Sequence, residues 1–232
     1  GSRSRSDIGS RVVNPFLDHN GINKIDAIFI SHNDTDHING IPEVIEHCKV
    51  GCVYTNDDFV GRTEQLGTDK YLNDYLIEKD LTIKSLFDEL NLNSSVNLQI
   101  LWPSKEASQN ESLGDNDKSQ VSLLEFAGKK ILLCSDIEKY AQRELLRLYP
   151  ELKADIVFVP HHGSVSTLED DFLKKLDPDI LIYSCDRIQY KRQSRVITKD
   201  DSTESFYTSK HGTIVICVST NGLVTTKTFL FK

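Results

Sequence analysis

Four residues of the types that bind metal ions lie within six positions of the chain, namely His32, Asp34, Asp36 and His37. They follow the apolar run IDAIFI (25–30), which is typical of a buried strand. Because alternate residues of an extended segment point the same way, the first two side chains can face one ion. The adjacent Asp36 and His37 lie in the turn that opens the next helix and can face a second ion. This loop therefore predicts a site for two metal ions.

Two other apolar segments end in residues of the same kinds. Asp136 follows KKILLCS (129–135), and His161 and His162 follow ADIVFVP (154–160). Loops at the strand ends of α/β folds commonly carry functional residues. A single histidine at the end of a strand is usually a surface residue. Three strand ends that all carry histidine or aspartate favour a metal site instead. Asp136 can bridge two ions about 3.5–4 Å apart, which hold a hydroxide and stabilise charge on a phosphoryl or carbonyl group.

These segments resemble those of a known family. SHNDTDHINGI (31–41) resembles the H-x-H-x-D-H signature of the metallo-β-lactamase superfamily. VPHHGSVST (159–167) and the later DPDILIYS (177–184) resemble the ComEC-type competence metallohydrolases, and HGTIVICVSTNG (211–222) resembles their closing hairpin. The resemblance covers residue 7 to the end of the chain. It implies a metal-dependent hydrolase acting on phosphodiesters, with DNA or RNA first, through a hydroxide held by two divalent ions.

The resemblance also assigns roles to residues. It implies a metal-ligand set of His32, Asp34, Asp36, His37, Asp136 and His162. Asn116 or Asp117 is a further candidate ligand, and His161 stays open as an alternative to His162. Residues expected to act in catalysis are Asp36, His161 and His162.

Substrate contacts are predicted for a second group of residues. Gly163 and Ser164 would open a helix whose N–H groups can hold a phosphate oxygen. A basic and aromatic cluster follows residue 186, although a solvated surface is the more common explanation for such a cluster. The predicted substrate-binding residues are Asn116, Ser119, Ser164, Arg187 and Lys191.

The chain departs from the superfamily pattern in two ways. Asp34 replaces the second histidine of the signature, and no histidine occurs between Cys48 and Asp136. DNDKSQVSLLEF (115–126) resembles the segment that ComEC-type proteins carry instead of the missing ligand. Carboxylate ligands shift the preference of the site from Zn²⁺ toward Mn²⁺ or Mg²⁺, so two ions of Mn²⁺ or Zn²⁺, with Mg²⁺ as a further candidate, are the expected cofactors. The missing histidine keeps open a non-catalytic sensor or adaptor module.

Composition limits the range of partners. The 232 residues carry a formal net charge of −8, so nucleic acid would need a local basic patch or a metal site. The acidic balance keeps open the hydrolysis of a small phosphodiester or another ester. No apolar run approaches the roughly 20 residues of a membrane span, so no membrane insertion is expected. Five cysteines without framework spacing suggest reduced thiols and a cytoplasmic location.

The order of elements predicts the fold class. Strands are expected over 24–31, 51–55, 96–103, 120–126, 129–135, 154–160 and 179–185, and a final hairpin turns at Asn221–Gly222. Helices are expected over 39–49, 137–149 and 167–178, with one or two more within 57–92, whereas 186–206 is polar and partly basic. This alternation is typical of α/β proteins with a mixed sheet or two sheets. The resemblance implies an αββα four-layer sandwich.

The expected domain organisation is simple. Residues 1–6 are expected to be a tag or linker, and residues 7–232 one metallo-β-lactamase-like domain. The first strands of that fold are expected to lie outside this sequence, so the domain is expected to be part of a longer chain or a complex.

Overall fold

The computed structural model describes residues 7–56, 67–87, 95–196 and 202–230. The predicted tag at 1–6 lies outside these ranges, as does 57–66 of the stretch expected to be helical. The chain divides into two compact units. Unit 1 comprises Gly1–Glu89 and Lys105–Asp115, and unit 2 comprises Leu90–Ser104 and Asn116–Lys232. The single domain predicted over 7–232 stays a prediction.

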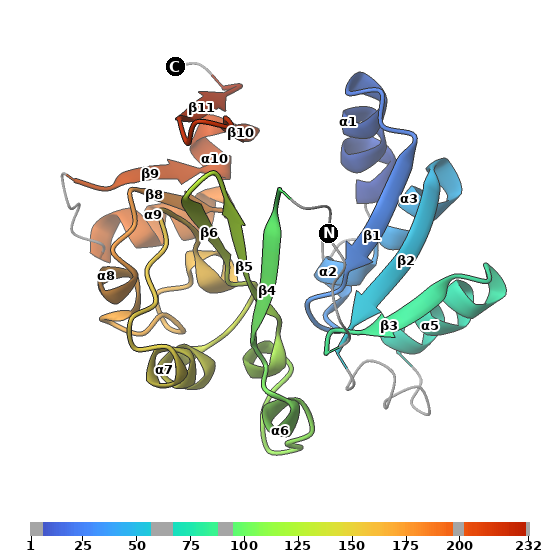
Figure 1. Ribbon diagram of the computed structural model, residues 1–232, viewed down its shortest axis with the longest axis horizontal. Coiled ribbons are helices and arrows are strands. Elements are labelled where there is room, and N and C mark those ends of the chain that lie inside the picture. The colour runs from blue at the N-terminus through green and yellow to red at the C-terminus, as the bar shows by residue number, and fades with distance from the viewer. Residues whose placement is uncertain (1–6, 57–66, 88–94, 197–201, 231–232) are drawn as a thin grey trace. The chain divides into compact units, whose positions relative to one another are not determined.

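Unit 1 is built on a parallel sheet in the order β1-β2-β3 (Figure 1). Its strands are β1 (Lys24–Phe29), β2 (Lys49–Thr55) and β3 (Thr82–Ser85). Its helices are η1 (Gly9–Val13), α1 (Asn14–His19), α2 (Thr35–Ile38), α3 (Ile41–His47), α5 (Thr68–Glu78) and α6 (Lys105–Ser108). Helix α5 is amphipathic, since Leu72 and Leu76 are buried and the neighbouring Ile77 is exposed. The core consists of Ile30, Ile38, Ile41, Val53, Leu72 and Leu76.

The strand at the end of the 57–92 stretch was not predicted. Helix α5 confirms one of the expected helices, but Thr82–Ser85 form a strand that pairs in parallel with β2. The register places Ile83 beside Val53, and the Leu86 N–H donates to the Thr55 carbonyl at 2.9 Å. Pairing with a buried strand therefore outweighed the helical spacing of Leu86 and Phe87.

Unit 2 contains a six-stranded sheet in the order β4-β5-β6-β7-β8-β9. Strands β4 to β6 pair antiparallel, and β6 to β9 pair in parallel. The strands are β4 (Asn97–Trp102), β5 (Val121–Phe126), β6 (Lys129–Leu133), β7 (Ile156–Phe158), β8 (Ile180–Tyr183) and β9 (Glu204–Tyr207). The helices are η2 (Asn116–Lys118), α7 (Lys139–Leu148), η3 (Pro160–Gly163), α8 (Phe172–Leu176), α9 (Arg187–Val196) and α10 (Thr208–His211). Helix α9 and strand β9 fall in the stretch to which the sequence assigned no element.

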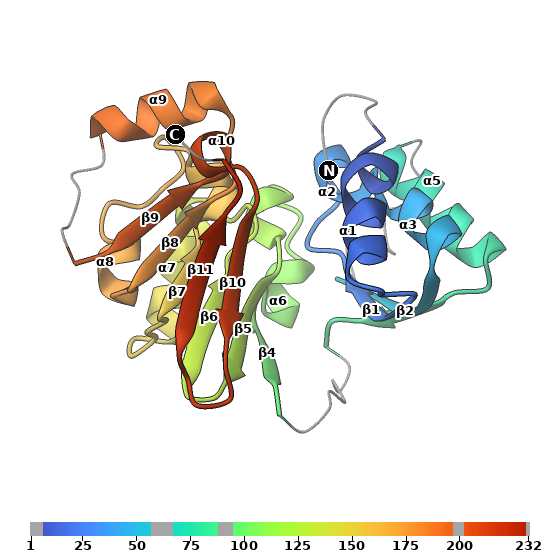
Figure 2. The ribbon, with the colours of Figure 1, turned by 90° about the horizontal axis from the view of Figure 1, so that it is seen from above.

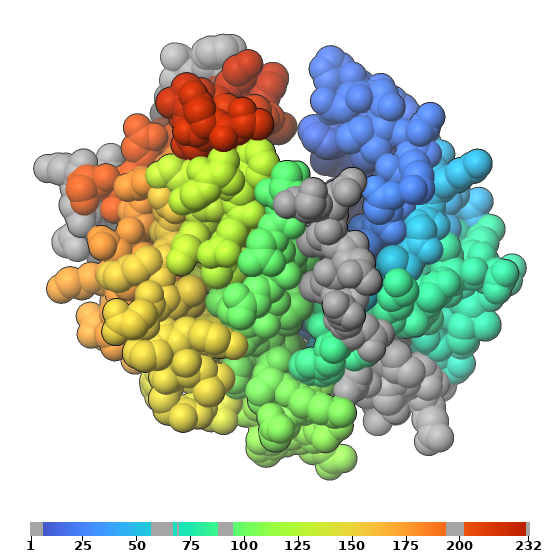
Figure 3. Space-filling view, viewed as in Figure 1, coloured from blue at the N-terminus to red at the C-terminus, as the bar shows by residue number. Residues whose placement is uncertain are grey.

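The two faces of this sheet are covered differently. The hairpin of β10 (Ile214–Val218) and β11 (Val224–Thr228) packs on one face, where its apolar residues meet Ile156, Ile180 and Ile182 (Figure 2). Helices α7, α8 and α9 lie on the opposite side of the sheet (Figure 1). Helix α7, yellow in Figure 3, is exposed at the surface of the unit. The hairpin predicted at the end of the chain is confirmed.

The parallel strands of unit 2 explain where its polar loops lie. In the register of β6, β7 and β8, Leu133 pairs with Phe158 and Phe158 pairs with Ile182. The three carboxyl ends therefore meet at one edge of the sheet. Asp136 and His162, which follow two of these strands, are brought to that edge, as the position of ligands in α/β folds requires.

The predicted α/β class with more than one sheet is confirmed. No helix among the described residues combines the length and the apolarity that crossing a membrane requires. All five cysteines are free, as expected. The cytoplasmic location inferred from them stays a prediction.

His211 has a structural role at the end of β9. Its Nδ1 accepts a hydrogen bond of 3.0 Å from the Tyr207 backbone N–H, and its ring lies edge-on to Phe206. A nitrogen that accepts this bond cannot carry a proton. Burial, followed by the positive charge of Lys210, lowers the pKa of His211.

We therefore expect His211 to destabilise the protein in mild acid. Because its pKa is lower in the folded state, the unfolded chain binds the proton first, and stability falls as the pH drops below the ordinary histidine value of about 6.5. His211→Asn, which keeps an acceptor near the Tyr207 N–H but does not titrate, should lose less stability between pH 7 and pH 5. Denaturant unfolding at several pH values measures this difference. Parallel curves for the two proteins would contradict the prediction.

Candidate metal centre

The His/Asp loop of unit 1 is organised by Ser31, which follows the apolar run. Its Oγ lies 3.1 Å from Nδ1 of His32 and 3.2 Å from Nδ1 of His37. The two rings are 4.1 Å apart between centroids, and the His37 N–H donates to the Asp34 carbonyl at 2.8 Å. Because Ser31 engages Nδ1 of each ring, a metal ion would bind these histidines through Nε2.

His32 and Asp34 have a spacing that suits one ion. Nε2 of the buried His32 lies 3.6 Å from Oδ2 of Asp34. Two ligand atoms about 2.1 Å from one tetrahedral ion lie about 3.4 Å from each other. The pair therefore fits two adjacent ligands. Asp36 lies half-buried in the first turn of α2, next to His37.

Unit 2 presents a second pair with the same spacing. Nε2 of His162 lies 3.6 Å from Oδ2 of Asp136, which is 5% exposed. The backbone N–H of Asp136 donates to Oγ of Ser119 at 3.2 Å, and the preceding Ser135 has a φ of 49°. The His161 N–H donates to the Ser135 carbonyl at 2.9 Å. The two loops are thus tied together, and the carboxylate and the imidazole fit a divalent ion.

The structure favours His162 over His161 as a ligand. Nδ1 of His162 lies 2.8 Å from the Ser184 carbonyl oxygen, which can only accept a hydrogen bond. Nδ1 must therefore carry the proton, and in the neutral ring Nε2 then has the lone pair that a metal needs. His161 instead directs Nδ1 toward Oε1 of Glu138 at 3.4 Å. Its catalytic role stays a prediction.

Both histidines and the following glycine have an unusual backbone. The φ angles of His161, His162 and Gly163 are 46°, 58° and 75°, so three successive residues are left-handed. Such conformations cost about 1–2 kcal/mol for a residue other than glycine and persist only where the surroundings enforce them. We call residues 161–163 the left-handed turn.

The residues predicted to contact substrate have mixed surroundings. Nδ2 of Asn116 donates to Oε1 of Glu138 at 3.0 Å, and fully buried Ser119 donates its hydroxyl hydrogen to the Asn116 carbonyl at 2.7 Å. Arg187 and Lys191 are exposed on α9. Substrate contact by these residues stays a prediction, and Ser119 in addition supports Asp136.

The helix predicted to begin at Ser164 was wrong. The Ser164 N–H donates to the His161 carbonyl at 2.9 Å and closes the left-handed turn, and the next helix begins only at Phe172. This N–H is thus already engaged. A phosphate contact of Ser164 would involve its hydroxyl, which lies 3.1 Å from that of Ser166.

Asp117, the alternative metal ligand, caps a helix. Its Oδ1 accepts the backbone N–H groups of Glu138 and Ala141 at 3.0 and 3.1 Å, at the start of α7. Burial raises the pKa of Asp117, and the two N–H groups oppose that shift. A capping aspartate can be recognised from the sequence only when it directly precedes its helix in the chain. Asp117 lies 21 residues before Glu138, so this role was not predictable.

Three further residues of the site were missed by sequence reasoning. Ser31 orients two histidines, Glu138 faces His161, and Gln193 donates to the left-handed turn. Ser31 precedes the loop directly, so its position was a signal. The contacts of Glu138 and Gln193 depend on tertiary structure alone.

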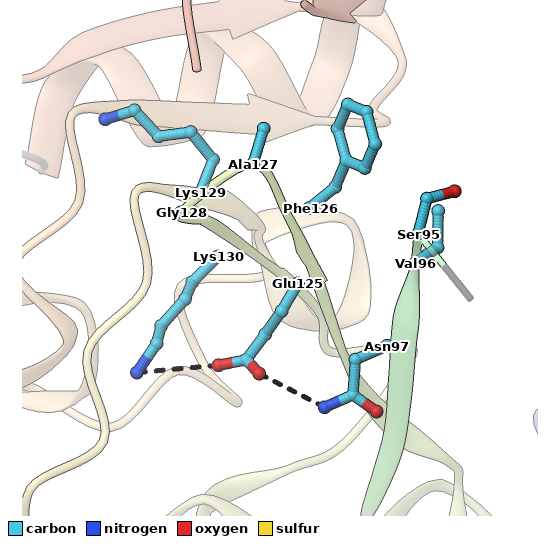
Figure 4. A pocket seen from close by; sticks show the side chains of 9 residues that line it. All are labelled: Ser95, Val96, Asn97, Glu125, Phe126, Ala127, Gly128, Lys129 and Lys130. Atoms are coloured by element: carbon cyan, nitrogen blue, oxygen red, sulfur yellow. Dashed lines mark hydrogen bonds and ion pairs between the residues drawn. The ribbon is translucent and has the colours of Figure 1, made fainter. Parts of the chain in front are cut away.

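A cavity in unit 2 does not contain the predicted residues. It has a volume of about 500 Å³ and lies along the turn between β5 and β6 (Figure 4). Glu125 lies between Lys130 and Asn97, at 3.6 and 3.2 Å. Because these polar groups already pair with one another, the cavity offers no comparable metal site.

Comparison with known proteins identifies the family. Residues 3–90, which include the loop from His32 to His37, match the model of the metallo-β-lactamase superfamily. These residues belong to a domain of the metallo-β-lactamase superfamily. The membership supports a metal-dependent hydrolase and implies divalent metal ions.

Curated relatives support the ComEC-type subgroup. ComE operon protein 3 of Bacillus subtilis is 30% identical over 179 residues, 76% of this chain and 22% of that protein. Recombination protein 2 of Haemophilus influenzae is 25% identical over 173 residues, 75% and 19% of the two chains. Competence protein ComA of Neisseria gonorrhoeae is 22% identical over 171 residues, 73% and 21%. The chain thus spans about a fifth of the length of these relatives.

Two solved structures are similar at a lower level. The metallo-β-lactamase fold protein YhfI from Bacillus subtilis is 11% identical with a TM-score of 0.44, over 88% of this chain and 78% of that one. A diphosphatase of the PhnP family is 16% identical with a TM-score of 0.44, over 82% and 72%. At these scores neither similarity bears on function.

The left-handed turn makes a specific prediction for Gly163. A Cβ atom there would lie 2.5 Å from both Nε2 of Gln193 and Cδ1 of Tyr183, whereas a Cβ on Gly128, with a φ of 78°, meets nothing within 4 Å. Gly128→Ala should lower the free energy of unfolding by about 1–2 kcal/mol, the cost of the backbone conformation alone. Gly163→Ala should cost about 1–3 kcal/mol more, because it also overpacks. Denaturant unfolding measures both, and equal losses would contradict the described packing.

Proposed function

We propose that this domain is a metal-dependent phosphodiesterase that cleaves nucleic acid. The observation that supports this most directly is the position of helix α9. Gln193 of this helix donates to the carbonyls of His162 and Gly163 at 2.8 and 2.7 Å. The same helix exposes Arg187 and Lys191 and has four basic and no acidic residues in RIQYKRQSRV. A basic helix therefore adjoins a predicted metal ligand.

This charge distribution suits a polyanion better than a small ester. The chain as a whole carries a net charge of −8, so long-range attraction does not bring nucleic acid to it. Local phosphate contacts must then supply the affinity, and lysine and arginine are the residues that make them. The relatives named as competence and recombination proteins are consistent with DNA as the polymer.

The side chains described above have distinct roles in this proposal. Superfamily membership is the reason to expect that each of the two His/Asp pairs would hold a divalent ion. Divalent ions bound by these residues would polarise a phosphoryl oxygen and lower the pKa of water. The carboxylates favour Mn²⁺ beside Zn²⁺.

His162 and His161 would then act differently. The hydrogen bond to Ser184 fixes the His162 proton on Nδ1, so this ring can bind an ion through Nε2 but is not the proton carrier. His161 lies near Oε1 of Glu138, and a histidine with a carboxylate at one nitrogen can hold a proton for a leaving oxygen at the other. We therefore assign proton transfer to His161.

Metal content and cleavage together test the function. The wild-type protein should bind two divalent ions and nick plasmid DNA in the presence of Mn²⁺. Asp36→Ala removes a predicted ligand and should reduce the rate of nicking by at least about 100-fold, since even changes outside the ligand shell cost 10–100-fold. Asp26→Ala is the control, because Asp26 is exposed on β1 and its carboxylate pairs with Lys24.

The outcomes separate the alternatives. Cleavage that persists in Asp36→Ala would mean that a contaminating nuclease or another centre is responsible. Two ions with turnover of a chromogenic phosphodiester alone would make the substrate a small molecule. A wild-type protein that binds no ion would favour the sensor or adaptor module.

The basic helix can be tested apart from the metal ligands. The double variant Arg187→Glu/Lys191→Glu should reduce plasmid cleavage by about 10-fold or more at physiological salt, and lower the slope of affinity against salt by about 2, one for each phosphate contact. Turnover of the small phosphodiester should change by less than about 2-fold. Lys174→Glu/Lys175→Glu on α8 is a control of equal charge. Equal effects of the two double variants on plasmid cleavage would contradict a phosphate contact by α9.

A further inference from the structure

We propose that Gln193 is a positioning residue that holds His162 in its metal-binding orientation, an inference that rests on the proposed metal-dependent function. Gln193 lies on α9 and is 1% exposed. Its Nε2 donates to two consecutive carbonyls, those of His162 at 2.8 Å and Gly163 at 2.7 Å. One buried amide group thus binds the backbone of the left-handed turn at two points.

These bonds complete the hydrogen bonding of the turn. The His161 carbonyl accepts from the Ser164 N–H within the chain itself. The next two carbonyls, those of His162 and Gly163, accept hydrogen bonds from the amide of Gln193. Because left-handed residues other than glycine persist only when their surroundings enforce them, this amide is one of the contacts that keep His162 in place.

The oxygen of the same amide indicates that the hydrogen bonds donated by Nε2 are the reason for a glutamine at this position. Oε1 of Gln193 is buried and finds no hydrogen-bond partner within the part of the chain that the structure describes. An unpaired buried acceptor is unfavourable, and an apolar side chain of similar volume would avoid it. Among the described contacts, only the two hydrogen bonds that Nε2 donates therefore favour glutamine over such an apolar side chain.

Packing locks the same arrangement. A Cβ on Gly163 would come within 2.5 Å of Nε2 of Gln193 and Cδ1 of Tyr183, so the glycine backbone lies directly against both side chains. Ser184, which follows Tyr183, accepts the hydrogen bond from Nδ1 of His162. The ring of His162 is thus held by Ser184, the residue after β8, and its backbone is held by Gln193 of α9.

Loss of the amide should therefore loosen the ring. Without the donors, the carbonyls of the turn must find other partners, and the peptide can rotate away from its left-handed conformation. His162 would then spend time away from Ser184, and both neutral tautomers would be populated. Changes of this kind outside the ligand shell typically weaken metal binding by about 10–100-fold.

The experiment compares two glutamines of the same helix. Gln193→Met keeps the length of the side chain and removes the donors, and Gln189→Met makes the same change one helical turn earlier. Histidine labelled with ¹⁵N reports the tautomer of His162 in the metal-free protein at pH 8, where its signal is identified by its absence in His162→Gln. Competition with a chromogenic chelator gives the affinity for Zn²⁺.

Each outcome bears on the proposal. We expect wild type and Gln189→Met to show a proton on Nδ1 of His162 and affinities within about 2-fold of each other. Gln193→Met should show mixed tautomers and an affinity lower by about 10–100-fold. If Gln193→Met retains the wild-type signal and affinity, the inference is overturned.

Two further cases are covered. If Gln193→Met does not fold, Gln193→Asn keeps an amide one carbon shorter, which cannot reach both carbonyls, and should give the same mixed signal. If the wild-type protein binds neither Zn²⁺ nor Mn²⁺, the proposed function fails, and the tautomer in the metal-free protein decides the role of Gln193 alone. A wild-type signal in the variant then overturns it, and a mixed signal supports it.

Discussion

The site in unit 2 depends on a backbone that is unfavourable by itself. Three successive residues, His161 to Gly163, are left-handed, and two of them have a Cβ. Within the turn itself, the backbone N–H of Ser164 donates to the His161 carbonyl. The rest comes from elements distant in sequence, through the Ser184 carbonyl and the amide of Gln193. The sheet and α9 therefore supply the contacts that hold this turn in its unfavourable conformation, as expected where a side chain must keep a fixed orientation.

This arrangement links two properties that the proposed phosphodiesterase would need. A metal ligand requires a fixed imidazole, and a polyanionic substrate requires exposed positive charge. Helix α9 serves both, because its inner side carries Gln193 and its outer side carries Arg187 and Lys191. An acidic protein can thus carry a basic surface where it is useful while its remaining surface repels nucleic acid.

The sequence predicted the strands that precede the candidate site residues better than the contacts that support these residues. The apolar strands before His32, Asp136 and His161 were recognisable, because buried parallel strands are continuous apolar runs. The parallel register that brings Asp136 and His162 to one sheet edge followed from the α/β class. The choice between His161 and His162 did not follow, because it depends on a carbonyl 22 residues further along.

The misses have a common physical origin. Strand β3 is only four residues long, and its pairing with Val53 and its neighbours in β2 made it a strand. Helix α9 has a polar sequence whose few inward side chains give no clear periodicity, so tertiary contacts define it. Ser164 follows residues that look like a helix start, but the left-handed turn uses its N–H internally. In each case the structure depends on a contact that the local sequence pattern does not reveal.

In the loop of unit 1, a single hydroxyl group orients two imidazole rings. Ser31 has one hydrogen and two lone pairs, and its Oγ lies within 3.2 Å of Nδ1 of both His32 and His37. Two neutral rings that each bind an ion through Nε2 must both carry their proton on Nδ1. Oγ can accept from both at once and turn its own hydrogen elsewhere. Alanine could accept from neither ring, whereas threonine would keep the acceptor. A serine shortly after β1 would thus satisfy the requirement of the two predicted ligands without adding a charge that would compete for the ion.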